Sequence, residues 1–278
     1  MSRMTADLHE AVIVIAREAG QAIMAVYENA FDVQRKSDDS PLTAADMAAH
    51  QVIADGLRRL TPQWPVLSEE AADIPWAERG QWPTYWLVDP LDGTREFIKR
   101  NGEFTVNIAL IEQNEPIFGV VHAPVTGETW HARQGRNAYR RLGDVDAQIR
   151  TRAPATGTLK VAASRSHRDA RTQAFLDAMG GIEEVSLGSS LKFCRIAEGA
   201  LDVYPRFGPT SEWDTAAAQC VLEAAGGALL APDGRAFRYN RRETLLNGDF
   251  VALGDMTLPW RTWLARAQDG DHGHALIA

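Results

Sequence analysis

The first half of the chain changes from a helical to an extended hydrophobic pattern. From Leu8 to Tyr27 apolar side chains recur along one helical stripe, and Asp46–Leu60 repeats this pattern after the Ser40-Pro41 pair. Short apolar runs follow, and these predict β-strands. The strands are expected at Trp64–Leu67, Tyr85–Val88, Phe104–Glu112, Pro116–His122 and Thr129–Ala132.

The second half alternates between strands and helices. A polar stretch from Arg136 to Thr158, to which we assign no element, separates it from the first half. Strands are then expected at Leu159–Ala163, Val185–Leu187, Leu201–Tyr204 and Ala228–Leu230, and helices at Asp169–Met179, Leu191–Ala200 and Trp213–Ala225. Such alternation is typical of layered α/β proteins. We therefore expect an α/β fold in one compact unit, divided into residues 1–150 and 151–278, with residues 259–278 as a polar tail.

The composition narrows the class of protein. Of the 278 residues, 45% are hydrophobic and 24% are charged, which excludes an intrinsically disordered chain. The 29 Lys and Arg against 37 Asp and Glu give a net charge of −8, which argues against binding to nucleic acid. Cys194 and Cys220 form no disulfide pattern, and no apolar run approaches the length of a membrane span. We therefore expect a cytoplasmic protein without a transmembrane segment.

The segment Asp89-Pro-Leu-Asp-Gly-Thr94 combines a turn with two carboxylates. Pro followed by Asp-Gly is strong turn chemistry, so a surface turn would explain the segment equally well on its own. Asp89, however, directly follows the apolar strand Tyr85–Val88, and α/β proteins bind ligands at the carboxyl ends of strands. The turn directs Asp89, Asp92 and the Leu91 carbonyl towards one spot. Divalent cations such as Mg²⁺ prefer this oxygen-only ligand set.

Further acidic positions have a structural as well as a functional interpretation. The pair Glu69-Glu70 is a metal ligand only if its strand lies beside the one that ends at Asp89; otherwise it is a solvated surface feature. Asp214 suits the first turn of a helix, and that placement is compatible with metal binding. For Asp46, which closes a capping box that begins at Thr43, the pattern favours capping over catalysis.

Gly93 and Thr94 open the segment Arg95–Arg100, which is consistent with a helical turn. Backbone amides at a helix start bind phosphate oxygens well. Carboxylates that gather cations beside such amides would make a phosphate-hydrolysing site, because bound cations turn an acidic pocket electropositive.

Together these motifs resemble the inositol monophosphatase superfamily of magnesium-dependent phosphatases. Three motifs in this order carry the resemblance: Glu69-Glu70, Asp89-Pro-Leu-Asp-Gly-Thr94 and Trp213-Asp-Thr-Ala-Ala217. Within the superfamily the chain resembles the bacterial 3'(2'),5'-bisphosphate nucleotidase branch over residues 8–253. That match runs through Lys36–Pro41, Glu96–Ile108, Gly188–Phe193 and Tyr204–Pro209. The resemblance implies an αβαβα sandwich and an enzyme inhibited by lithium.

The resemblance also implies roles for individual residues. The ligands of two or three Mg²⁺ ions would be Glu69, Asp89, the Leu91 carbonyl, Asp92 and Asp214. The expected catalytic residues are Asp46, Thr94 and Glu69, and Thr94, hydrogen-bonded to Asp46, would orient and deprotonate the attacking water. The expected substrate contacts are the amides of Gly93 and Thr94 on the phosphate, with His167, Ser189, Lys192 and Arg206 on the nucleotide. Arg95 and Ala218 replace the Lys and Gly more usual in the family, and neither change affects this chemistry.

The implied reaction is hydrolysis of the 3'-phosphate of 3'-phosphoadenosine 5'-phosphate to AMP and phosphate, which recycles a nucleotide of sulfur assimilation. An inositol or sugar monophosphatase with the same metal core is the alternative if Lys192 is a solvated helix lysine and Arg206 a strand-edge charge. A non-catalytic metal or nucleotide sensor is the remote alternative, although all the acidic positions and Thr94 are intact. The oligomeric state stays open, and some relatives associate loosely with the inner membrane.

Overall fold

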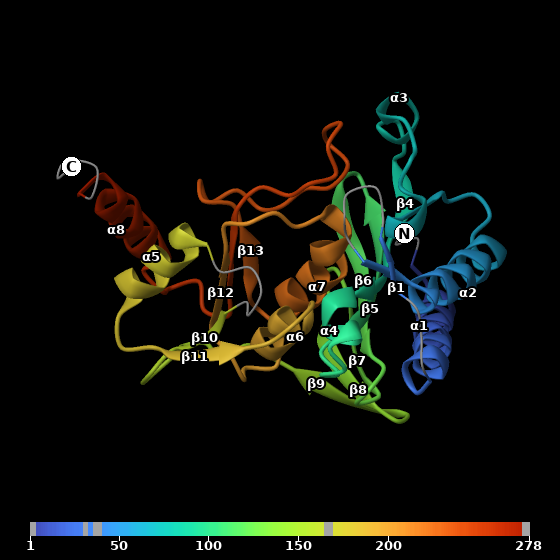
Figure 1. Cartoon of the computed structure of the whole chain (residues 1–278), viewed down its shortest axis with the longest axis horizontal. Helices are drawn as coiled ribbons and strands as arrows, with labels where there is room; N and C mark the ends of the chain where they lie inside the picture. Colours follow the sequence, from blue (N-terminus) through green and yellow to red (C-terminus); the bar gives the residue numbers. More distant parts are fainter. Residues whose placement is uncertain (1–3, 30–32, 36–40, 164–168, 274–278) are drawn as a thin grey trace.

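The computed structural model of the protein has five layers, in which two β-sheets alternate with three layers of helices (Figure 1). It describes residues 4–29, 33–35, 41–163 and 169–273. Helices α1 and α2 cover one side of the first sheet, α6 and α7 lie between the sheets, and α5 and α8 cover the second sheet. The expected αβαβα sandwich is confirmed.

The outer helices α1 (Ala6–Tyr27) and α2 (Ala44–Leu60) form where the hydrophobic stripes predict them. Their apolar faces share one buried cluster with the first sheet, to which Ile13, Ile53 and Trp86 belong. The seven strands of this sheet lie in sequence order from β3 to β9. They are β3 (Val66–Ser68), β4 (Thr84–Asp92), β5 (Thr105–Glu112), β6 (Glu115–Ala123), β7 (Glu128–Arg133), β8 (Ala138–Leu142) and β9 (Val145–Ile149).

The central layer holds α6 (Leu191–Ala197) and α7 (Glu212–Ala224). Helix α7 crosses β6 at Gly119, where an added Cβ would lie 2.2 Å from the Ala217 carbonyl oxygen. Only glycine allows this close approach, and it brings the start of α7 towards the end of β4. The short elements around this region are β1 (Val33–Arg35), β2 (Pro41–Thr43), the 3-10 turn Glu69–Ala71, α3 (Trp76–Arg79) and α4 (Thr94–Ile98).

The second sheet has the strand order β11-β10-β12-β14-β13, so β12 is its middle strand. Strands β10 and β11 pair in parallel, whereas β14 is antiparallel to both of its neighbours. The elements of this half are β10 (Lys160–Ala163), α5 (Ala170–Met179), β11 (Glu183–Ser186), β12 (Val203–Arg206), β13 (Ala228–Leu230), β14 (Phe250–Leu253) and α8 (Trp260–Gly273).

The structure corrects two expectations and adds one strand. Residues 259–278 are not simply a polar tail, because α8 buries Trp260 and Trp263 in a cluster that also contains Phe175 of α5. The polar stretch Arg136–Thr158 contains the hairpin β8–β9, of which mainly the two ends are buried. Strand β14 lies in a buried apolar run, for which the sequence analysis predicts no strand.

The division into residues 1–150 and 151–278 stays a proposal. The first sheet ends at Ile149 and the second begins at Lys160, but the largest hydrophobic cluster includes side chains from both. Among the described residues, none of the helices combines the length and apolar composition needed to cross a membrane. The two cysteines are buried and unpaired.

Candidate metal and phosphate site

The end of β4 turns into the centre of the molecule. Pairing with β5 is regular up to Asp89 and then shifts before Asp92, which frees the intervening residues from the ladder. The Leu91 amide donates to Asp89 Oδ1 at 3.1 Å and so fixes this carboxylate. Gly93 has a φ of 93°, a left-handed conformation that favours glycine, and the chain then enters α4. The turn chemistry and the predicted strand end are thus parts of one feature.

Three carboxylates converge at this turn. Each of Asp89, Asp92 and Asp214 offers an oxygen, and these oxygens all lie within 4.8 Å of one another. Asp214 comes from the first turn of α7, where its Oδ2 accepts from the Ser211 amide at 2.8 Å. The predicted helix-start position of Asp214 is confirmed, and it directs the side chain towards the end of β4.

The strand that precedes Glu69 lies beside the strand of Asp89, as metal binding by Glu69 requires. Strand β3 lies parallel to β4 with Ser68 opposite Val88, so Glu69, directly after β3, lies at the level of Asp89 in β4. Its carboxyl group is close enough to Asp89 to raise the pKa of that residue.

The electrostatics of this cluster fit a cation. Burial raises the pKa of Asp89 well above its usual value, and the negative charges of Glu69, Asp92 and Asp214 raise it further. Burial and Asp92 likewise raise the pKa of Asp214. Several carboxylates in one buried place repel one another unless positive charge neutralises them, and their hard oxygen atoms suit a divalent cation.

Asp46 caps α2 and also contacts Thr94. Its Oδ2 accepts from the Thr43 amide and the Thr43 hydroxyl, both at 2.7 Å, which completes the capping box of α2. Its Oδ1 accepts from the Thr94 hydroxyl at 3.3 Å. Capping therefore orients Asp46 towards Thr94 instead of competing with that contact.

Lys192 and Arg206 form a buried positive pair near this cluster. Each is only 6% exposed. The Lys192 ammonium donates to the Ser189 carbonyl at 2.7 Å and lies 5.1 Å from the centre of the Tyr204 ring. Burial lowers the pKa of Lys192 to about 8, and the charge of Arg206 lowers it in the same direction, whereas Asp92 opposes the shift. His167, which the resemblance places near the base, lies outside the described residues.

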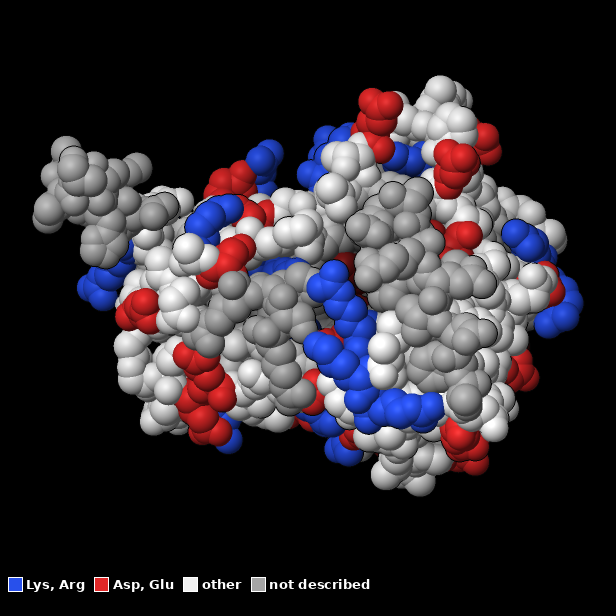
Figure 2. All heavy atoms as spheres, viewed as in Figure 1, with Lys and Arg blue, Asp and Glu red and all other residues white. Residues whose placement is uncertain are grey.

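The face above the site carries further positive charge. Figure 2 shows Lys and Arg side chains gathered in a run over α4 and the residues that follow it. This segment contains Arg95, Lys99 and Arg100, all of them exposed. An anionic ligand would therefore approach through positive side chains despite the net charge of −8.

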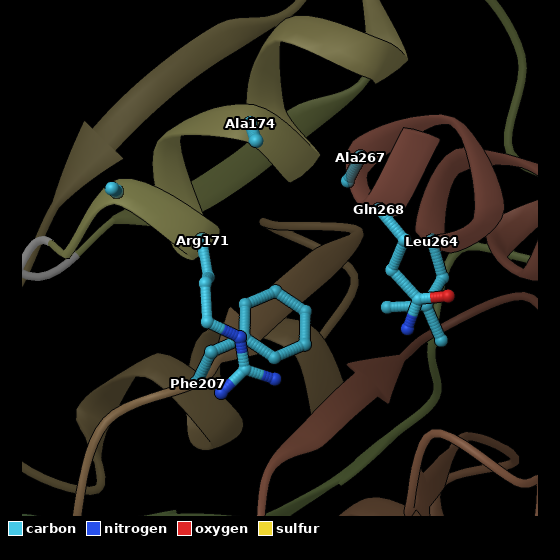
Figure 3. A pocket seen from close by; sticks show the side chains of 7 residues that line it. Arg171, Ala174, Phe207, Leu264, Ala267 and Gln268 are labelled. Atoms are coloured by element: carbon cyan, nitrogen blue, oxygen red, sulfur yellow. The ribbon is translucent and has the colours of Figure 1, made fainter. Parts of the chain in front are cut away.

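A separate pocket lies on the other side of the second sheet, between α5 and α8 (Figure 3). Arg171 extends over the Phe207 ring, with its guanidinium carbon 5.3 Å from the ring centre, and also pairs with Asp249. These two contacts account for the position of the Arg171 side chain, and Phe207 belongs to the hydrophobic cluster beneath α5 and α8. The pocket is therefore not part of the carboxylate site.

Two polar residues of the site were not predicted. Asn107 of β5 and Ser190, just before α6, are each 1% exposed and both contact Asp92. Both lie inside motifs that carried the family resemblance, Glu96–Ile108 and Gly188–Phe193. A buried strand position that is polar instead of apolar was the available signal for Asn107.

The fold and the carboxylate cluster together define the class: a layered α/β protein with a candidate divalent-cation site near the end of a strand of the first sheet. The model of the inositol monophosphatase family matches residues 5–267, and the chain belongs to this family.

Named relatives and solved structures agree with this membership. The chain is 53% identical over 244 residues to the 3'(2'),5'-bisphosphate nucleotidase CysQ of Salmonella typhimurium, a match that covers 87% of this chain and 97% of the relative. It is 37% identical to the CysQ of Aggregatibacter actinomycetemcomitans, with 94% and 97% covered. The crystal structure of CysQ from Bacteroides thetaiotaomicron aligns with a TM-score of 0.79 at 40% identity, covering 89% of this chain and 97% of that one.

Proposed function

We propose that the protein is a magnesium-dependent 3'(2'),5'-bisphosphate nucleotidase that hydrolyses 3'-phosphoadenosine 5'-phosphate to AMP and phosphate. Relatives with this enzyme name match the chain over nearly their full length. The observation that carries the choice of substrate is the position of Lys192 and Arg206, two buried cations close to Asp92 and Asp214 of the carboxylate cluster. Charged groups of this kind form strong hydrogen bonds with phosphate, so a substrate with a second phosphate would be favoured here.

The carboxylate cluster would hold two or three Mg²⁺ ions. Their proposed ligands are Glu69, Asp89, the Leu91 carbonyl, Asp92 and Asp214. When bound, Mg²⁺ supplies charge neutralisation for the phosphate dianion and for the leaving oxygen, and it lowers the pKa of a water molecule.

The protein's own residues would place the water and accept its proton. The Thr94 hydroxyl donates a hydrogen bond to Asp46 Oδ1 at 3.3 Å, with the Leu91 carbonyl as an alternative acceptor at 3.4 Å. The lone pairs of Thr94 Oγ1 are therefore available to accept from the attacking water. The water oxygen would form a bond to phosphorus as the bond from phosphorus to the 3'-oxygen breaks, while the proton of the attacking water passes through Thr94 to Asp46. A second water molecule would protonate the leaving 3'-oxygen, and the proton held at Asp46 would neutralise the hydroxide that remains. The backbone amides of Gly93 and Thr94 would bind the phosphate oxygens through this change.

The structure disfavours the plain alternatives for the two cations. Lys192 is buried and makes hydrogen bonds to backbone carbonyls, so it is not a solvated helix lysine. Arg206 lies on β12, the middle strand of its sheet, so it is not a strand-edge charge. Ser189 lies beside Lys192 in the same turn, which supports a joint role in binding the 5'-phosphate. The role of His167 near the base stays a prediction.

The first test compares substrates. Purified protein with Mg²⁺ is expected to release phosphate from 3'-phosphoadenosine 5'-phosphate at least about tenfold faster than from inositol 1-phosphate at equal concentration, which corresponds to about 1.4 kcal/mol. Equal or reversed rates would move the assignment to an inositol or sugar phosphatase. Release from neither substrate would favour a sensor. Cytoplasmic location, association with the inner membrane and inhibition by lithium remain predictions.

Lys192→Ala is expected to raise KM for the bisphosphate by about tenfold or more, since a hydrogen bond to a charged group contributes about 1.5–3 kcal/mol. The same change should scarcely affect a simple monophosphate ester, and an equal loss on both substrates would contradict the assignment.

Because the pKa of Lys192 is lowered to about 8, its charge is present below that pH and is lost above it. The wild-type kcat/KM for the bisphosphate should therefore fall as pH rises through 8, and Lys192→Arg should fall less.

A further inference from the structure

One oxygen of Asp92 is fully engaged by hydrogen bonds. Its Oδ2 accepts from the Ser190 amide at 2.7 Å, the Ser190 hydroxyl at 2.8 Å and the Asn107 side-chain amide at 3.2 Å. Among the described residues, no hydrogen bond reaches Oδ1. The arrangement therefore fixes the carboxylate and leaves one oxygen for a cation.

Asn107 determines how the Ser190 hydroxyl points. The Asn107 Nδ2 group lies 2.9 Å from Ser190 Oγ, so one of its two protons reaches Ser190 while the other reaches Asp92. The Asn107 Oδ1 atom accepts from the Thr105 hydroxyl at 3.0 Å, which sets the orientation of the amide. Because Ser190 Oγ accepts from Asn107, its own proton is left to donate to Asp92 Oδ2 or to the Asp214 carbonyl.

Ser190 reaches two of the three clustered aspartates. Besides Asp92 Oδ2, its hydroxyl lies 2.8 Å from the backbone carbonyl of Asp214. A hydroxyl has a single proton, so Ser190 Oγ donates to one of these two acceptors at a time. With either acceptor, the hydrogen bond connects Ser190 to a residue of the carboxylate cluster. Asp92 belongs to the first sheet and Asp214 to α7. Ser190 therefore connects the two elements whose relative position determines where these carboxylates lie.

We propose that Ser190, oriented by Asn107, is a positioning residue that fixes Asp92 and Asp214 relative to each other for divalent-cation binding. The inference rests on the proposed function, because it assumes that both aspartates bind the cation. Groups that orient metal ligands through hydrogen bonds contribute to cation affinity although they do not touch the cation. Ser190 follows Ser189 directly and precedes Lys192 by two residues, so this positioning residue lies next to the proposed nucleotide contacts in the chain.

The test measures cation binding in the absence of substrate. Mn²⁺ serves as the probe, because it also prefers oxygen ligands and its free form gives an electron paramagnetic resonance signal. Ser190→Ala is expected to weaken Mn²⁺ binding about 10- to 100-fold. Asn107→Leu should also weaken it, and the double variant should lose much less than the product of the two single losses, because both act through one hydrogen-bonded unit.

Thr61→Val is the matched control. Thr61 is buried, and its hydroxyl donates to the Leu57 carbonyl and accepts from the Trp86 indole, so this variant also removes a buried hydroxyl but one with no hydrogen bond to the carboxylates. Melting temperatures of the ion-free proteins report the cost to folding, and Thr61→Val should melt lower without a change in Mn²⁺ affinity. A Ser190→Ala affinity within about twofold of the wild type, or an equal loss in Thr61→Val, overturns the inference while leaving the proposed function intact. If the wild type binds no Mn²⁺, both fail together.

Discussion

Asp89→Asn is expected to reduce phosphate release at least about a thousandfold, while the ion-free variant melts at a higher temperature than the ion-free wild type. Asn keeps the size of the side chain and an oxygen that can accept from the Leu91 amide. It removes one negative charge from the proposed cation ligands, and a loss of about 4 kcal/mol of transition-state stabilisation corresponds to about a thousandfold. Without cations, the same change relieves the repulsion that, together with burial, raises the pKa of Asp89.

These opposite signs separate a chemical defect from a folding defect. Phosphate release at saturating Mg²⁺ and thermal unfolding in a chelator are the two measurements. Glu70→Gln is the control, because it removes the acid next to Glu69, and we assign Glu70 no role in the reaction. Full activity of Asp89→Asn at saturating Mg²⁺ would refute the proposed metal site.

Thr94→Val is expected to lower kcat by about 10²- to 10⁴-fold and to leave Mn²⁺ affinity unchanged, since proton transfer by a positioned side chain contributes in that range. The variant keeps the shape of the side chain and the backbone amide at the start of α4 but removes the hydroxyl that connects to Asp46. The measurement is kcat at saturating substrate and cation, with Mn²⁺ binding determined on the same samples.

Thr94→Ser provides the rescue for this prediction. Serine retains the hydroxyl, so it should recover most of the activity that valine loses. An unchanged kcat in Thr94→Val would remove Thr94 and Asp46 from proton transfer and leave Asp46 with its capping role alone.

The turn at Asp89 shows what the sequence could predict. An apolar strand, a Pro and an Asp-Gly pair within a few residues predict carboxylates near the end of a strand, although β4 continues to Asp92 beyond the expected end at Val88. The start of α7 is specified in the same local way by a capping box around Asp214. Local patterns therefore predicted both halves of the carboxylate cluster, and the family resemblance brought them together.

Other features depend on contacts that no local pattern contains. Ser190 and Asn107 are 83 positions apart, and only tertiary packing brings them together. The hairpin β8–β9 lies at a sheet edge with much of its surface exposed, so its polar pattern is hard to distinguish from a loop. Helix α8 is different, because the spacing of Trp260, Trp263 and Leu264 was a helical signal that its polar neighbours obscured.

Asp46 and Asp214 each give one oxygen to the first turn of a helix. A side chain held in this way has lost most of its rotational freedom when the helix forms, before any ligand arrives. The conformational entropy of these two carboxylates is therefore lost when the protein folds, and cation or substrate binding does not lose it again. Substitutions of Thr43 or Ser211, which complete these caps, would leave the two carboxylates less ordered in the folded protein. Cation or substrate binding would then have to order them.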